Sequence, residues 1–293
     1  MKINFPTAGA SGALYAVGAA ITNMWSNNVP GVQAASQASA GGIANLNMVS
    51  DGEAQVSIAI SSNVYQCLNG TDSFKDHPYK DLKAIAGLYM NPNQVVVTAK
   101  SGIQTLADVK GKRFAVASAG SSVYNESNAH FTAAGLKFPD DIQAEYITFT
   151  DAADMLQNGS IDGAWIMSGA PASAVTQALT GGARLVDIDD QLMKDLKAKY
   201  PWYASYTIKA GTYPNQDRDV RTTAVKMVMF TRGDMPEDVV YNLTKTFWEH
   251  IDELGQAQKN LKGLKPEDAV KDIANVPLHR GAEKYYREIG VLK

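Results

Sequence analysis

Residues 113–127 read RFAVASAGSSVYNES. The apolar run 114–117 is typical of a buried strand, and residues 125–134 have the spacing of a helix. Between them lie only small residues: Ser118, Ala119, Gly120, Ser121 and Ser122. No acid or base stands beside these serines in the sequence. Two explanations are open: a tight turn, or a backbone that faces something other than protein.

The same order of strand, small residues and helix recurs along the whole chain. Strands alternating with helices predict an α/β protein with mainly parallel sheets flanked by helices. The pattern predicts strands over 3–7, 32–37, 56–60, 82–89, 94–99, 114–117, 144–149, 161–167, 184–188, 205–208 and 220–231. It predicts helices over 13–25, 43–50, 64–68, 106–112, 125–134, from 150 onward, and over 172–179, 237–254, 266–273 and 281–288.

The strand and helix series restarts after Ala99, and an extended segment over 205–231 returns the chain. We therefore predict two lobes, one formed by residues 1–99 and 210–293 and the other by residues 100–209. The chain would cross between the lobes near 97–101 and 205–213, and these crossings would act as hinges. A ligand that contacts both lobes would then favour a closed state.

Composition excludes several classes of function. The 293 residues carry a formal net charge of −3 and no block of like charge, so we expect no nucleic-acid partner. A single cysteine, Cys67, is expected to be a buried small apolar residue. The four histidines show no metal-ligand spacing, so no metal or cofactor is expected. No apolar run is long enough to span a bilayer. Without a visible signal peptide, the chain is either cytoplasmic or a processed exported protein.

Small residues gather at five strand-to-helix junctions: 9–12, 39–42, 61–63, 118–122 and 168–171. In open α/β sheets, ligands bind beyond the carboxyl ends of strands, where helix N-termini expose N–H groups. Together with serine hydroxyls, these donors can hold an anion without arginine or lysine. Ser and Gly are also ordinary cap and turn residues, so a structural role for any one junction stays open. Five such junctions favour a site between the lobes.

The candidate ligand-binding residues come mostly from these junctions, and no catalytic residue is expected. Tyr15 and Trp165 could stack on a ligand or belong to the core. Asn45 could donate to a carboxylate or cap a turn, and Tyr206 could seal the site or pack. The full set is Ser11, Gly12, Tyr15, Ser39, Gly42, Asn45, Ser61, Ser62, Ser118, Gly120, Ser121, Ser122, Trp165, Ser168, Gly169, Ala170 and Tyr206.

Several longer motifs resemble one family over nearly the whole chain. They are GASGALYAVG at 9–18, ASAGGIANL at 38–46, SGI at 101–103, LADVKGK at 106–112, Gly120-Ser121 and GAPA at 169–172. The most specific are AGTYPNQD at 210–217 and PLHRGAEKYYRE at 277–288. The chain resembles the TAXI subfamily of solute-binding proteins that serve TRAP transporters.

This resemblance implies a monomeric periplasmic type II binding protein of the Venus flytrap kind, with no cofactor. It would capture a small carboxylate such as glutamate or 2-oxoglutarate and deliver it to a sodium-driven membrane permease. The sequence departs from the family at the expected site. Gly42 stands where Ser is frequent, Ser62-Asn63 replaces a Ser-Asp-Val pattern, Ser118-Ala119 replaces a proline pair, and Ser122 replaces Gly. The ligand can therefore differ from the family's usual ones.

Two alternatives remain beside the transport role. Residues 9–13 resemble the Gly-x-Ser-x-Gly turn of serine hydrolases, with Ser11 as nucleophile, although Ala13 stands at the last glycine. Such an enzyme needs a histidine base, and His279 is the candidate. A sensor domain of the same fold would also bind a ligand but would act on a receptor. We expect AGTYPNQD to be a structural turn, and His279 to serve packing of the tail.

Overall fold

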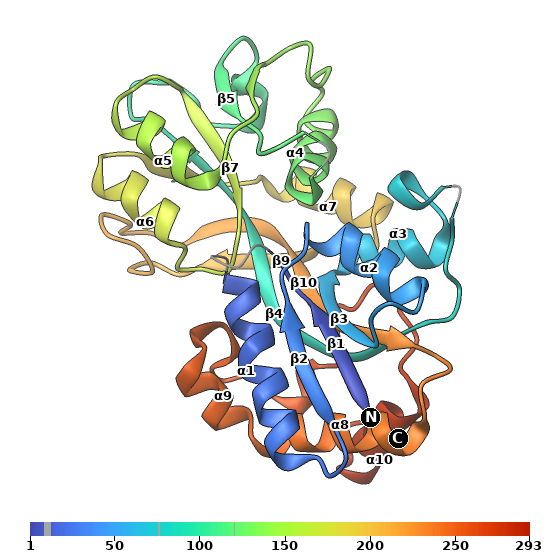
Figure 1. Ribbon diagram of the computed structural model, residues 1–293. Helices are drawn as coiled ribbons and strands as arrows, with labels where there is room; N and C mark the ends of the chain where they lie inside the picture. The colour runs from blue at the N-terminus through green and yellow to red at the C-terminus, as the bar shows by residue number, and fades with distance from the viewer. Residues whose placement is uncertain (9–12, 76, 120) are drawn as a thin grey trace. The chain divides into compact units, whose positions relative to one another are not determined.

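The computed structural model describes residues 1–8, 13–75, 77–119 and 121–293 (Figure 1). Its internal contacts divide the chain into two compact units. Unit 1 comprises Met1–Tyr89 and Lys226–Lys293, and unit 2 comprises Met90–Val225. The divisions fall inside two long strands, β4 (Leu82–Val97) and β10 (Val220–Arg232), which each continue from one unit into the other. The hinges predicted near 97–101 and 205–213 stay a prediction.

Unit 1 combines strands and helices from both ends of the chain. Strand β1 pairs in parallel with β2, and α1 packs along β2 (Figure 1). Strand β3 pairs antiparallel with β10. The elements are β1 (Lys2–Pro6), α1 (Ala13–Asn28), β2 (Gln33–Gln37), α2 (Gly42–Ser50), β3 (Val56–Ile60), α3 (Ser61–Asn69), η1 (Asp72–Phe74), α8 (Glu237–Glu249), α9 (Ile251–Ala257), η3 (Lys259–Leu261), η4 (Pro266–Asp268) and α10 (Arg280–Glu288).

The C-terminal segment is tied into the core of unit 1 by buried polar side chains. Trp25 on α1 donates its indole N–H to the carbonyl of Leu243 on α8 (3.0 Å). Tyr286 on α10 donates to the carbonyl of Ile85 and accepts from the indole of Trp248. These contacts join segments far apart in sequence, and this explains why residues after 226 complete the first unit. Cys67 is buried, as expected.

Unit 2 has its own core, and its strands belong to the eight-stranded sheet that also includes β3. Strand β5 pairs in parallel with β6 and with β7, whereas β4 runs antiparallel to β7 and β8, and β9 antiparallel to β10. The elements are η2 (Leu106–Val109), β5 (Arg113–Ala115), α4 (Ser122–Ala133), β6 (Gln143–Glu145), α5 (Phe149–Gln157), β7 (Gly163–Met167), α6 (Ser173–Thr180), β8 (Arg184–Val186), α7 (Asp190–Lys199) and β9 (Ala204–Ile208).

The predicted α/β class is confirmed, and the sheets are mixed rather than mainly parallel. The reason is that β4 and β10 run antiparallel to the strands beside them. The two strands predicted over 82–89 and 94–99 form one strand, β4. The helix predicted over 237–254 is two helices, because His250 leaves helical geometry between them (φ −110°, ψ 16°). Helix α7 was not predicted at all.

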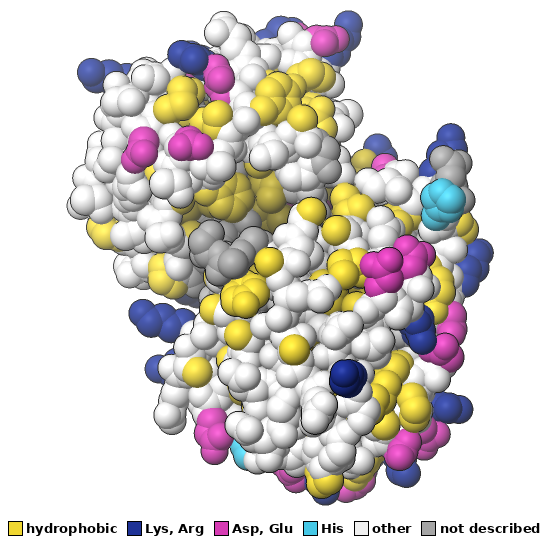
Figure 2. Space-filling model, viewed as in Figure 1, with side chains coloured by type: hydrophobic (Ala, Val, Ile, Leu, Met, Phe, Trp, Pro, Cys, Tyr) yellow, Lys and Arg dark blue, Asp and Glu magenta, His cyan; other side chains and the backbone are white. Residues whose placement is uncertain are grey.

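The surface and the helix lengths add two observations. In the described part of the chain, no helix combines the length and the apolar character needed to cross a bilayer. On the face drawn in Figure 2, acidic and basic side chains are interspersed, which agrees with the formal net charge of −3.

Candidate functional site

At one edge of unit 1, Asn45 links the residues that follow β1 and β2 to the main chain of β3. Asn45 is buried and donates through Nδ2 to the carbonyls of Thr7 (2.8 Å) and Ile58 (3.0 Å). Its Oδ1 accepts from the hydroxyl of Ser39 (2.6 Å). Both amide hydrogens are used within unit 1, so Asn45 positions this edge. Its predicted donation to a carboxylate stays a prediction.

The loop before α2 is shaped by glycine. Gly41, at the N-cap of α2, has a φ of 100°, which favours glycine, and its N–H donates to the hydroxyl of Ser39 (3.1 Å). A Cβ at Gly42 would lie 3.3 Å from both Ala59 Cβ and Asn63 Oδ1. This crowding gives a physical reason for glycine at position 42, where the resembled family often has Ser.

Ser61 and Ser62 begin α3 directly after β3, and both are buried. The hydroxyl of Ser61 accepts from the main-chain N–H of Lys226 on β10 (3.2 Å). Asn63, also buried, donates to Gln66 within the same helix (3.1 Å). This junction is therefore held by contacts within unit 1.

Unit 2 brings the junctions 118–122 and 168–170 to one edge of its sheet. Strands β5 and β7 are parallel neighbours, with Phe114 opposite Gly163 and Ala115 opposite Ala164. Because the two strands run in the same direction, the segments that follow their carboxyl ends, 118–122 and 168–170, leave the sheet on the same side. Carboxyl ends of parallel strands are where α/β proteins bind ligands.

The chain leaves β5 through an unusual backbone conformation. Ala117 is buried and has a φ of 64°, in the left-handed region that non-glycine residues rarely occupy. Ser118 follows, with an exposed side chain. Strained backbone of this kind concentrates at functional sites. The sequence analysis did not single out Ala117, since nothing in the residue type signals it.

Helix α4 begins at this edge, and Ser121 is its N-cap. The Ser121 hydroxyl accepts from the N–H of Tyr124 (3.1 Å), which satisfies one donor of the first turn. Ser121 therefore has a structural role as a helix cap, which is one of the two roles that the sequence left open. Ser122 is the first helical residue and is half-buried. The N-terminal dipole of α4 favours negative charge at this edge.

The second junction of unit 2 is supported by two residues that the sequence analysis did not assign to it. Gln94 on β4 donates to the carbonyl of Ser168 (3.0 Å) and accepts from the hydroxyl of Tyr213. Tyr213 in turn accepts from the N–H of Ala172, just before α6 (3.0 Å). The turn AGTYPNQD thus braces residues 168–172. Ser168, Gly169 and Ala170 are half-buried.

Trp165 is a core residue of unit 2, and its predicted contact with a ligand stays a prediction. Its side chain is 1% exposed, and the indole N–H donates to Asn93 Oδ1 (3.0 Å). Asn93 Nδ2 donates to the Thr223 hydroxyl (3.1 Å), which contacts His130 Nε2 (2.7 Å). His130 Nδ1 donates to the carbonyl of Glu126 (2.7 Å), so Nε2 accepts from Thr223. Burial lowers the pKa of His130 to about 4, which keeps it neutral.

The two predicted tyrosines are half-buried in their own units. Tyr15 lies in the first turn of α1. Tyr206 lies on β9 and packs against the core of unit 2, and burial raises its pKa. Three predicted site residues, Ser11, Gly12 and Gly120, lie outside the described residues.

His279 is not placed as a catalytic base. Nδ1 accepts from the N–H of Gly281 (3.1 Å), so the proton is on Nε2, which donates to the carbonyl of Met235 (3.0 Å). The residue is 1% exposed, and burial lowers its pKa. Both ring nitrogens are therefore used in packing of the tail, as expected.

A family model matches residues 5–290, which is almost the whole chain. The chain belongs to the NMT1-like family. Among solved structures, MatC from Rhodopseudomonas palustris with bound malate is similar with a TM-score of 0.59 and 14% identity, covering 100% of this chain and 99% of that chain. The periplasmic aliphatic sulphonate binding protein SsuA from Escherichia coli is similar with a TM-score of 0.51 and 16% identity, covering 100% of this chain and 94% of that chain. The alkanesulfonate-binding protein SsuA from Xanthomonas axonopodis pv. citri, bound to MOPS, is similar with a TM-score of 0.50 and 17% identity, covering 98% of this chain and 83% of that chain.

These similarities show the fold of this NMT1-like protein. It has the two-lobed α/β architecture of periplasmic binding proteins, with mixed sheets flanked by helices. One of these neighbours holds malate and another holds MOPS, and their likeness to this chain concerns the fold.

Proposed function

We propose that this protein is the solute-binding component of a TAXI-type TRAP transporter. It captures a small organic anion, a carboxylate such as 2-oxoglutarate or glutamate, outside the cytoplasm. It then delivers the anion to a sodium-coupled membrane permease. The two strand-end junctions of unit 2 that meet at one sheet edge, 118–122 and 168–170, carry this proposal.

The chemistry of this edge fits an anion held by neutral donors. The hydroxyls of Ser118 and Ser168 make no hydrogen bond to another described residue, and both side chains reach the surface. Helix α4 adds its N-terminal dipole. A hydrogen bond to a charged group contributes about 1.5–3 kcal/mol, so three or four converging donors reach the roughly −8 kcal/mol of micromolar binding.

The neighbours with known ligands support the same class. One structural neighbour holds malate, a dicarboxylate, and another holds MOPS, a sulfonate. Both are small organic anions. That the ligand is enclosed by unit 1 as well as unit 2 is part of the proposal, and small-angle scattering with and without ligand tests it through a change in radius of gyration.

Native mass spectrometry of protein purified without refolding would identify a co-purified small acid. Isothermal titration calorimetry with 2-oxoglutarate, glutamate, malate and an alkanesulfonate then measures affinity for the full chain. We expect Ser121→Ala combined with Ser122→Ala to weaken binding at least tenfold, which is about 1.4 kcal/mol. Unchanged affinity would refute the assignment of these serines.

Two control variants separate binding from stability. Thr105 caps η2, which precedes β5, so Thr105→Ala removes a helix cap away from the site. Ser160 is an exposed serine just before β7, at the opposite strand end from Ser168. Both variants should retain wild-type affinity. Sodium-dependent uptake into proteoliposomes with the permease tests the transport role, and export is tested by cell fractionation.

A further inference from the structure

Unit 2 contains a cavity that the proposed solute site does not use. Its volume is about 400 Å³, within the roughly 300–1,000 Å³ range of small-molecule sites. It lies between the C-terminal end of α6, the strand β8 and the turn 215–218, whereas residues 168–170 precede the other end of α6. Its lining is mainly polar, and the largely buried side chains of Leu179, Leu185 and Val220 add a small apolar part.

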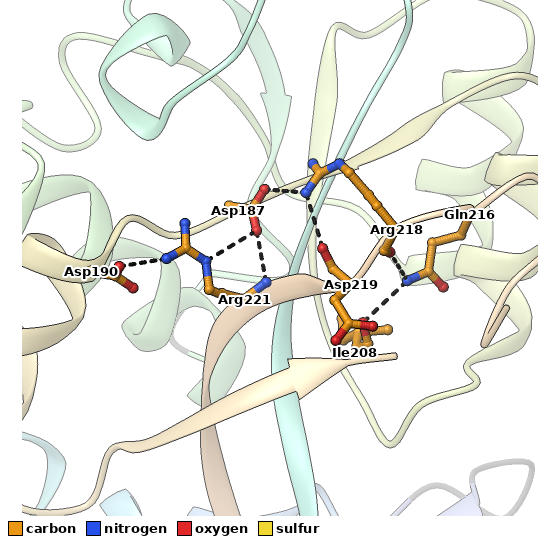
Figure 3. Close-up of polar contacts among 7 residues, drawn as sticks. All are labelled: Asp187, Asp190, Ile208, Gln216, Arg218, Asp219 and Arg221. Carbon is orange, nitrogen blue, oxygen red and sulfur yellow. Dashed lines mark hydrogen bonds and ion pairs between the residues drawn. The ribbon is translucent and has the colours of Figure 1, made fainter. Parts of the chain in front are cut away.

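One side of this cavity carries a positive charge without an acidic partner. Arg184, the first residue of β8, is half-buried and donates to the carbonyl of Ile103. Within the described residues it forms no ion pair. Arg218 also lines the cavity, but Asp187 neutralises it (2.5 Å), as Figure 3 shows. The cation left for a ligand is therefore Arg184.

The turn 215–218, which also lines the cavity, carries a negative charge that likewise has no ion-pair partner among the described residues. Asp217 lines the cavity, is exposed, and makes no hydrogen bond or ion pair among the residues that the structure describes. The turn itself is well fixed. Gln216 Nε2 donates to the carbonyls of Ile208 (3.2 Å) and Arg218 (2.9 Å), and Asn215 donates to the carbonyl of Leu179 (Figure 3 draws the Gln216 contacts).

A cation and an anion without ion-pair partners line one cavity that also has a small apolar part, and this combination matches a ligand that carries both charges on a short methylene chain. We propose that the cavity is a second binding site, for a small aliphatic zwitterion. Its carboxylate accepts from the Arg184 guanidinium, its ammonium group donates to the Asp217 carboxylate, and its chain contacts Leu179 and Leu185. Arginine suits the carboxylate because its planar fork can donate two parallel hydrogen bonds.

The test uses 6-aminohexanoate as probe, with hexanoate and hexylammonium as matched compounds that each lack one charge. Amide and side-chain NMR shifts of the full chain are followed during titration. We expect 6-aminohexanoate to shift signals of Gln104, Asn215 and Gln216, and to bind at least about tenfold more tightly than either matched compound. Equal affinity for hexanoate, or no shift at these residues, overturns the proposal.

Variants locate the charges. Arg184→Gln and Asp217→Asn should each weaken 6-aminohexanoate binding about tenfold, while Arg287→Gln on α10 and the exposed Asp140→Asn should not change it. Because Asp217 makes no hydrogen bond or ion pair with a described residue, we expect Asp217→Asn to fold normally. This variant therefore still tests the proposal if Arg184→Gln fails to fold. Retained affinity in Asp217→Asn overturns the proposal. Ser121→Ala with Ser122→Ala should leave this binding unchanged, so the outcome is separate from that of the proposed solute site.

Discussion

The strand ends of the two units look alike in sequence but differ in how their polar groups are used. In unit 1, Ser39, Asn45 and Ser61 direct their side chains to neighbouring main chain or to one another. In unit 2, Ser118 and Ser168 keep hydroxyls that no other described residue engages. The difference shows that a Ser-rich and Gly-rich junction can be either a clamp between strands or a set of donors for a ligand.

The clamp in unit 1 gives the largest expected effect. Asn45→Ala would leave the buried carbonyls of Thr7 and Ile58 without this donor, and each unsatisfied group costs about 1–3 kcal/mol. We expect the free energy of unfolding to fall by about 3–5 kcal/mol in urea denaturation. The exposed Asn69, which bonds only within its own helix, provides the control Asn69→Ala. If both variants lost the same small amount of unfolding free energy, Asn45 would not stabilise unit 1 by linking its strands.

Unit 2 should lose stability in acid through His130. Its pKa of about 4 lies below the ordinary 6.5, so the unfolded chain binds this proton more tightly. The stability that neutral His130 contributes is complete above pH 6.5 and is lost as the pH falls toward 4. The loss amounts to about 3 kcal/mol over that window.

Urea unfolding at pH 6.5 and pH 4.5 in wild type and His130→Gln isolates this contribution from that of the carboxylates. We expect the variant to have the smaller pH dependence. The same slope in both proteins would show that burial does not hold His130 neutral.

The brace behind the unit 2 junction should give an intermediate effect. Tyr213→Phe removes the hydroxyl that bonds Gln94 and the N–H of Ala172, and we expect a loss of about 2 kcal/mol. Tyr206→Phe is the matched control, since its hydroxyl makes no hydrogen bond to another described residue. Thermal unfolding measures both. An unaffected Tyr213→Phe variant would mean that residues 168–172 need no brace.

The smallest expected changes in unfolding free energy distinguish Ser121, which caps a helix, from Ser118, which we propose as a donor to the ligand. Ser121→Ala should lower the free energy of unfolding by about 1 kcal/mol, because the N–H of Tyr124 loses its acceptor. Ser118→Ala should change it by less than about 0.5 kcal/mol, as is usual for an exposed site. A larger loss in Ser118→Ala would mean that its hydroxyl has a structural role.

Strand and helix alternation was readable from the sequence because the central strands are short apolar runs. Strands β3 and β7 are buried throughout, and the small residues after them mark their ends. Strand direction was not readable, since the antiparallel pairing of β4 and β10 depends on segments far apart in sequence. Helix α7 did carry a signal: Asp189 caps it, and Leu192, Met193 and Leu196 form its buried face.

The candidate site was readable only at the level of loops. Every residue of β7 is buried, so nothing in the pattern separates Trp165 in the core from an aromatic at the rim. Gln94 and Tyr213 support the site from remote segments, and no local motif links them to Ser168. The sequence does not single out Arg184 and Asp217 as the charged residues of the cavity, because this depends on the ion pair between Arg218 and Asp187, which only the structure shows.

The most direct test of the solute site is hydrogen exchange of the full chain with and without the bound acid, using 2-oxoglutarate as probe. The account predicts slower exchange of amides in 118–124 and 168–173, with unchanged exchange around 158–162 at the opposite strand ends. Binding without protection of either junction of unit 2 would contradict it.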